Sequence, residues 1–117
     1  MQKILLLLAF VCLALPALNA QSARRLEVLF SNTHTKTDLA NIKAELGAQK
    51  ILLEYTHTAF DADGRLTEIA FTVDCQDGFK GSASTDKVPA ADEGKFGFYR
   101  DTRPGAKTPF GTGAITE

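Results

Sequence analysis

The feature that most constrains this fold is a pair of alternating segments joined by a short glycine-containing connection. The segments are Gln49–Phe60 ("QKILLEYTHTAF") and Arg65–Cys75 ("RLTEIAFTVDC"). A strand places successive side chains on opposite faces, so this alternation predicts strands with one buried and one wet face. In the second segment the apolar positions alternate with Glu68, Ala70, Thr72 and Asp74. The pair is therefore expected to form an antiparallel hairpin.

The connection "FDADGRL" between these segments resembles the middle of a calcium-binding loop. If Gly64 is the sixth loop position, Asp63 and Asp61 are the fifth and third, but the first and twelfth are Ala59 and Ala70. The first should be a carboxylate and the last a bidentate glutamate. The sequence therefore predicts a structural turn of Asp61, Asp63 and Gly64 and no metal site.

The segment "THTKTDLANIKAELG" changes to helical spacing, with apolar residues three and four positions apart. Thr35 or Thr37 is expected to cap the helix start, Asp38 suits its first turn, and Gly47 is expected to end it. The helix and the two alternating segments together supply the predicted core: Leu39, Ile42, Leu46, Leu53, Ile69, Phe71 and Val73.

Three further strands are predicted, at Arg25–Asn32, Phe79–Thr85 and Lys95–Asp101. The expected fold class is α+β, with one helix packed on a small, mostly antiparallel sheet of four to five strands in β-α-β-β-β order. A right-handed strand-helix-strand crossover is expected to place the helix on one sheet face. The uncovered face would carry Glu54, Thr56, Thr58, Glu68, Thr72 and Asp74.

The two ends of the chain define its expected organisation. Residues 1–20 combine Lys3, an apolar run over Ile4–Leu15 and small residues up to Ala20, which is typical of a signal peptide. An uncleaved anchor is the alternative. Residues 21–101 are expected to form a single domain, and the Gly-, Pro- and Thr-rich residues 102–117 a flexible tail. The protein is thus predicted to be exported, to the periplasm or beyond, with no integral membrane segment after cleavage.

Charge and cysteine content narrow the function. Removing the 20 residues of the predicted signal peptide from the 117-residue chain leaves 97 residues. Of the 13 Lys and Arg residues only Lys3 is removed, so 12 basic residues remain against 14 acidic ones. This near-neutral balance predicts no nucleic-acid partner. Only Cys75 remains of the two cysteines, so no internal disulfide is expected.

No catalytic or cofactor-binding residues are predicted. Cys75 lies on the apolar side of its strand beside Asp74 and Asp77, so we expect a buried thiol, with a disulfide-linked dimer as the second interpretation. His34 and His57 lie in different segments without a metal-ligand spacing. His57 continues the face of the odd-numbered apolar residues before it.

Three segments, "TKTDLANIKAEL", "FDADGRLTEIAFTV" and "GFYRD", resemble a small exported domain of Bacteroidetes. That domain also occurs at the C-terminus of antirepressor-type sensor metallopeptidases. The PepSY-type domain is a looser match in the order of its elements. The resemblance implies a βαββ fold and export, and it carries no catalytic motif. The matching positions are Thr37, Asp38, Leu39, Ile42, Lys43, Leu46, Gly64, Leu66, Thr67, Ile69, Tyr99 and Asp101.

These observations favour a non-catalytic exported interaction module. A sheet edge or the polar sheet face would contact a protein partner or a second copy of the chain. One alternative is a peptidase inhibitor or pro-domain-like regulator, whose extended tail would enter a cleft. A second alternative is a small thiol- or metal-dependent enzyme. No cofactor is expected.

Overall fold

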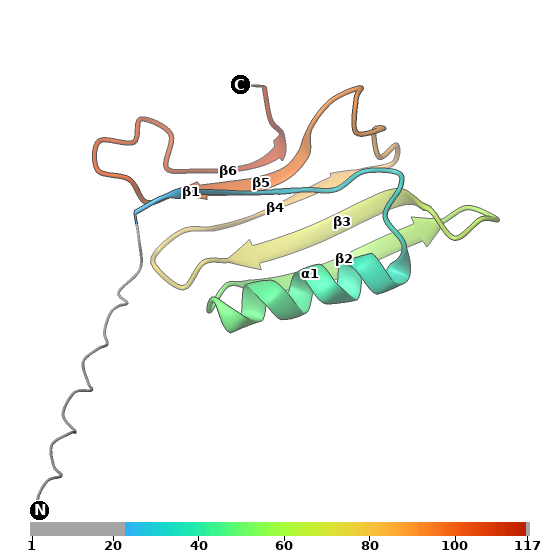
Figure 1. Ribbon diagram of the computed structural model, residues 1–117, viewed down its shortest axis with the longest axis horizontal. Coiled ribbons are helices and arrows are strands. Elements are labelled where there is room, and N and C mark those ends of the chain that lie inside the picture. Colours follow the sequence, from blue (N-terminus) through green and yellow to red (C-terminus); the bar gives the residue numbers. More distant parts are fainter. Residues whose placement is uncertain (1–22, 117) are drawn as a thin grey trace, which may run out of the picture.

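The structure, a computed structural model, describes residues 23–116 and contains one helix and six strands within that range (Figure 1). The elements are β1 (Arg25–Leu29), α1 (Lys36–Ala48), β2 (Leu52–Phe60), β3 (Leu66–Asp74), β4 (Lys80–Thr85), β5 (Phe96–Asp101) and β6 (Phe110–Ala114). The strands form two antiparallel three-stranded sheets, in the orders β1-β5-β6 and β2-β3-β4. The predicted signal peptide, residues 1–20, lies outside the described residues.

The α+β class is confirmed, but the expected single sheet of four to five strands is not found, because the strands form two sheets and a sixth strand extends the predicted β-α-β-β-β order. Strand β1 pairs with β5, with Arg25 opposite Asp101 and Leu29 opposite Gly97, and it does not join the sheet of β2. Strands β1 and β2, on either side of α1, therefore belong to different sheets, and the expected crossover within one sheet is not formed by them. The reason is that β1 finds its partner about 70 residues away, and local sequence patterns carry no information on such pairings.

Strand β6 corrects the expectation of a flexible tail over residues 102–117. Phe110–Ala114 pairs with β5, with Phe98 opposite Thr112. The strand also contacts β4, where the hydroxyl of Thr112 donates to the carbonyl of Ser82 at 3.0 Å. Ile115 follows the strand and is buried. The folded part of the chain thus extends beyond Asp101, because a strand neighbour compensates for the weak propensity of "FGTGA".

Local hydrogen bonds set both ends of α1. Thr35 is the N-cap: its side chain accepts from the amide of Asp38, and the Asp38 carboxylate accepts from the amide of Thr35 at 2.9 Å. At the other end Gly47 lies inside the helix. Lys50 takes the left-handed conformation (φ 67°), its amide donates to Gly47, and the amide of Ile51 donates to Leu46. The helix therefore continues to Ala48, and the left-handed residue after it is Lys50, three residues beyond the predicted Gly47.

One hydrophobic core fills the space between the two sheets and α1. Its centre is Phe71 on β3, whose ring centroid lies 5.3 Å from that of Phe30 and 6.1 Å and 6.2 Å from those of Phe96 and Phe98. Of the seven predicted core residues, six are buried and Ile42 is partly buried. The Tyr55 hydroxyl anchors β2 to the helix by donating to the carbonyl of Leu39 at 2.7 Å.

Within residues 23–116 there is no helix long and apolar enough to cross a membrane. The one helix, α1, has 13 residues, whereas a span needs about 20 apolar residues.

Candidate functional site

The outer surface of the β2-β3-β4 sheet is the principal candidate for a functional surface. Antiparallel pairing arranges its outward side chains in three rows across the strands. We call this surface the polar sheet face. Its rows are Leu52-Asp74-Lys80, Glu54-Thr72-Ser82 and His57-Ala70-Ser84. Most of these residues are exposed.

A β-bulge in β2 decides which residues reach this face. Tyr55 lies opposite Phe71 and His57 opposite Ala70, so Thr56 is the extra residue. The bulge reverses the alternation beyond it. His57, predicted on the face of the odd-numbered apolar residues, therefore points outward, and Thr58, predicted on the polar face, lies opposite buried Ile69. Both predictions assumed unbroken alternation.

One end of the polar sheet face is hollowed. The hollow has a volume of about 420 Å³ and includes Leu52, Glu54, Asp74 and Lys80 in its lining. Leu52 is 50% exposed and is the only large hydrophobic residue so exposed in the described part of the chain. The Glu54 carboxylate pairs at 3.0 Å with Lys43 of α1. An apolar centre thus lies among charged and hydroxyl-bearing side chains.

At the other end of the β2-β3 hairpin, the structure places Asp61, Asp63 and Gly64 in the connecting turn. The Asp61 carboxylate accepts from the amides of Asp63 at 2.9 Å and Arg65 at 3.0 Å, and Gly64 has φ 80°. The hydrogen bonds from the backbone, that of Arg65 first, lower the pKa of Asp61. Asp61 therefore has a structural function in closing the turn.

The other metal-ligand candidates are apart in the structure. His34 accepts from the amide of Ser31 through Nδ1 at 3.0 Å, and His57 Nε2 lies 2.9 Å from Glu68 Oε1 on the polar sheet face. Residues 23–116 contain no group of three or more His, Cys, Asp or Glu side chains placed to hold a metal ion. The structure therefore offers no ligand cluster at the positions considered from the sequence.

Cys75 is buried, and its surroundings oppose thiolate formation. Burial has the largest effect and, together with the carboxylates of Asp77 and Asp74, raises the pKa of Cys75 to about 11. The positive charge of Arg100 offsets part of this increase. Because the thiolate is the reactive form, Cys75 is a poor nucleophile at neutral pH. Its side chain lies at the edge of a pocket that also includes Arg100 and Ile51.

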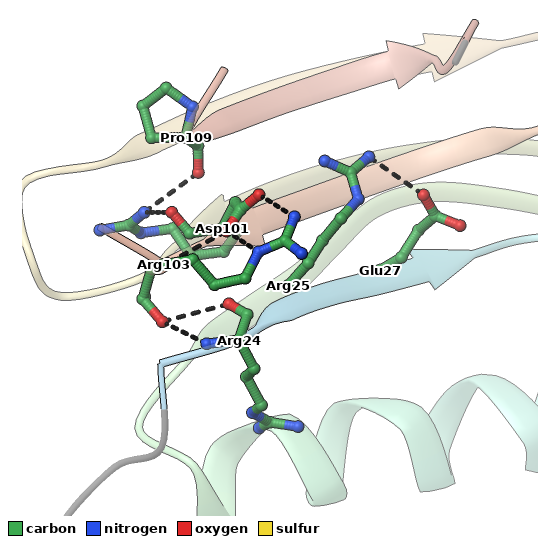
Figure 2. A network of polar contacts seen from close by, with 8 residues as sticks. Arg24, Arg25, Glu27, Asp101, Arg103 and Pro109 are labelled. Carbon is green, nitrogen blue, oxygen red and sulfur yellow. Dashed lines mark hydrogen bonds and ion pairs between the residues drawn. The ribbon is translucent and has the colours of Figure 1, made fainter. Parts of the chain in front are cut away.

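A buried carboxylate, Asp101, holds the end of the β1-β5-β6 sheet (Figure 2). Arg103 donates to both oxygens, from Nε at 2.9 Å and from Nη2 at 2.7 Å. These bonds lower the pKa of Asp101 to about 2. Next to them the amide of Arg24 donates to the Thr102 hydroxyl at 3.0 Å, and the Thr102 amide donates to the Arg24 carbonyl. The network ties the start of β1 to the chain beyond β5.

Sequence reasoning identified Asp101 only as a framework position and did not identify Arg100 or Arg103. Arg100 could have been found, because it continues the alternation of Phe96 and Phe98 toward the interior. Its side chain is 14% exposed and its Nε donates to Asp77 at 2.8 Å. No comparable pattern signals Arg103, which lies beyond the strand.

Comparison with protein families, with curated proteins and with solved structures found no match to this chain. The resemblance to the exported Bacteroidetes domain and to PepSY-type domains therefore stays a prediction.

Proposed function

We propose that this chain is an exported, non-catalytic binding module that contacts a protein partner through the polar sheet face. The observation that carries the proposal is the exposure of Leu52 in the lining of the hollow in that face. Protein interfaces commonly combine an apolar centre with a polar rim. Leu52 would supply the centre, and Glu54, Asp74 and Lys80 the rim.

The partner is expected to present an apolar side chain to Leu52 and polar groups to the surrounding hydroxyls. Thr72 and Ser82 lie opposite one another in the central row of the face and each can donate and accept a hydrogen bond. The rim contains both signs of charge, so the face favours a mixed rather than a strongly basic or acidic protein surface. Export remains a proposal based on residues 1–20.

No specific observation favours the two alternative functions. The peptidase-inhibitor hypothesis drew on a βαββ fold and on an extended C-terminal tail, and Phe110–Ala114 of that tail forms strand β6. The thiol-enzyme hypothesis required an activated Cys75, whose pKa is raised to about 11 by burial and neighbouring carboxylates. The binding module is therefore the function that we carry forward.

The test compares capture of a partner by the protein and by two single variants. Leu52→Asp places a charge at the apolar centre of the face, whereas Ala40→Asp places the same charge on the exposed side of α1. Proteins cross-linked to the tagged protein in the envelope fraction are identified, and the purified partner is then titrated. We expect at least a tenfold weaker Kd for Leu52→Asp and no change for Ala40→Asp. Equal binding by both variants, or no partner for a strictly monomeric protein, would refute the proposal.

A further inference from the structure

A second hollow lies at the end of the molecule where four segments converge. The segments are the end of α1, the start of β1, the β3-β4 turn and the end of β5. The pocket has a volume of about 310 Å³, at the lower end of the range of about 300–1,000 Å³ usual for small-molecule sites. Its lining residues are Arg24, Leu26, Ala48, Gln49, Lys50, Ile51, Cys75, Asp77, Arg100 and Thr102.

Part of this pocket is apolar. Leu26, Ile51 and Cys75 line it, and the last two are buried at 8% exposure. Ala48, in the last turn of α1, adds a small side chain that leaves room at the wall. The Cys75 thiol is protonated at neutral pH and so behaves as part of this apolar surface. The interior therefore suits a short hydrocarbon body.

The polar part of the pocket is cationic. Arg24, Lys50 and Arg100 supply three positive charges, and Asp77 supplies one negative charge. This local excess of two positive charges occurs in a chain whose formal net charge is −1. Positive charges so close together around a partly enclosed hollow raise the local concentration of anions.

Two of the cations, Arg100 and Arg24, are held by hydrogen bonds beside the hollow. The Arg100 guanidinium is fixed by Asp77 at 2.8 Å and by the carbonyls of Asp101 and Pro109, and it lies 4.3 Å from the centre of the Phe79 ring. Arg24 donates from Nη2 to the side chain of Gln49, across the gap between β1 and α1. Arg24 is thereby held over the pocket, and it can exchange this neutral acceptor for an anionic one, which gives a stronger hydrogen bond.

We propose that this pocket binds a small anionic amphiphile, with a carboxylate or phosphate headgroup against Arg24 and Lys50 and a short hydrocarbon body against Leu26, Ile51 and Cys75. The basis is the complementarity of a cationic rim and an apolar interior within about 310 Å³. This site is separate from the polar sheet face and does not depend on the function proposed for that face.

The test is a titration of the purified protein, expressed as the full chain, followed by amide NMR shifts. The probes are octanoate, octyl phosphate and, as the control of opposite charge, octylammonium. We expect saturable shifts at the amides of Ile51, Cys75 and Asp77 with both anionic probes. The tighter of the two identifies the preferred headgroup. The proposal would be overturned if neither anion gave saturable shifts at millimolar concentration, or if octylammonium bound as tightly as the anions.

Three variants separate the contributions of charge and shape. Arg24→Glu with Lys50→Glu should weaken octanoate binding at least tenfold, whereas Lys36→Glu, the same change at the opposite end of α1, should leave it unchanged. Ala48→Leu keeps every charge and fills the pocket wall, so it should also weaken octanoate binding at least tenfold. Unaltered binding by both the charge-reversal variant and Ala48→Leu, each with a native amide spectrum, would contradict the assignment.

Discussion

Replacing Gly97 by alanine tests the pairing of β1 with β5, which is the feature of the fold that the sequence least predicts. A Cβ at Gly97 would lie 2.9 Å from the carbonyl carbon of Val28 and 3.0 Å from Cα of Leu29, and closer still to the Val28 oxygen. These atoms belong to the backbone of β1 and cannot rotate away. Alanine can therefore be accommodated only if the two strands separate.

The expected cost follows from what such a separation breaks. The β1-β5 ladder contains five residue pairs, from Arg25-Asp101 to Leu29-Gly97. With about 1 kcal/mol of net stability per backbone hydrogen bond, loss of most of this ladder costs about 3–5 kcal/mol. That is a large share of the 5–15 kcal/mol typical of a whole domain. Gly97→Ala should therefore unfold the protein or lower its Tm by more than about 15 °C.

Two other glycines provide matched controls for the same chemical change. Gly64 has open space around its Cβ position but has φ 80°, so Gly64→Ala should destabilise the protein by about 1 kcal/mol. This cost is the strain of alanine in the left-handed conformation minus the stabilisation from the lower conformational entropy of the unfolded chain. Gly47 lies in α1 with nothing within 4 Å, so Gly47→Ala should stabilise by about 0.5–1 kcal/mol.

The assay is urea denaturation followed by circular dichroism. If Gly97→Ala were no worse than Gly64→Ala, then β1 and β5 would not be packed as the structure places them, and the reasoning would be refuted.

Four further predictions concern individual contacts. Lys50→Gly should stabilise the protein by about 0.5–1 kcal/mol in urea denaturation, because glycine adopts the left-handed conformation at the helix end without strain. Asp101 has a folded pKa of about 2 against an ordinary 3.8, so its ion pair stabilises the protein above about pH 4 and is lost as pH falls toward 2. Asp101→Asn should accordingly lower Tm at pH 6, and the gap to wild type should narrow between pH 4 and pH 2; a constant gap would contradict this. Deleting residues 102–117 should destabilise the protein by at least about 2–3 kcal/mol, because it removes β6 and the buried Ile115. Unchanged stability would instead support the original prediction that these residues form a flexible tail. Chelators should leave Tm unchanged, because Asp61 is engaged by backbone amides, and a large decrease would restore a metal site at the turn.

The parts of the fold that sequence reasoning predicted are those fixed by neighbours along the chain. Thr35, one of the two predicted N-caps, lies three residues before Asp38, which was predicted only to suit the first turn, and the β2-β3 hairpin closes through a turn at Gly64. Local hydrogen bonds determine both features, so the sequence contains the information. The buried side of β3 from Ile69 to Val73 also follows directly from the alternation of its residues.

The parts that it missed depend on distant partners or on single-residue irregularities. Residues Phe110–Ala114 contain two glycines and no alternation, and they form a strand because β5 presents a free edge to them. The bulge at Thr56 reverses the side-chain pattern, and no residue type at that position signals it. The pairing of Asp101 with Arg103 lies at a strand end where spacing alone cannot place two side chains.

The candidate surfaces were predictable to different degrees for the same reason. The polar sheet face follows from the alternation of β3, although the bulge changes two of its members. The second pocket does not, because Arg24, Lys50 and Arg100 come from three segments that are far apart in the sequence and meet only in the folded chain.

The β3-β4 turn belongs to both surfaces, and this decides which variants can distinguish them. Asp74 lies on the polar sheet face and accepts from the amide of Gln76 at 2.8 Å, while Cys75 and Asp77 line the pocket. Gln76 in turn donates to the carbonyl of Lys50 at 2.8 Å, which connects the turn to the end of α1. A change within the turn would therefore disturb partner binding and ligand binding together. Leu52 lines only the hollow of the polar sheet face and Arg24 only the pocket, so substitutions at these two positions separate the two binding activities.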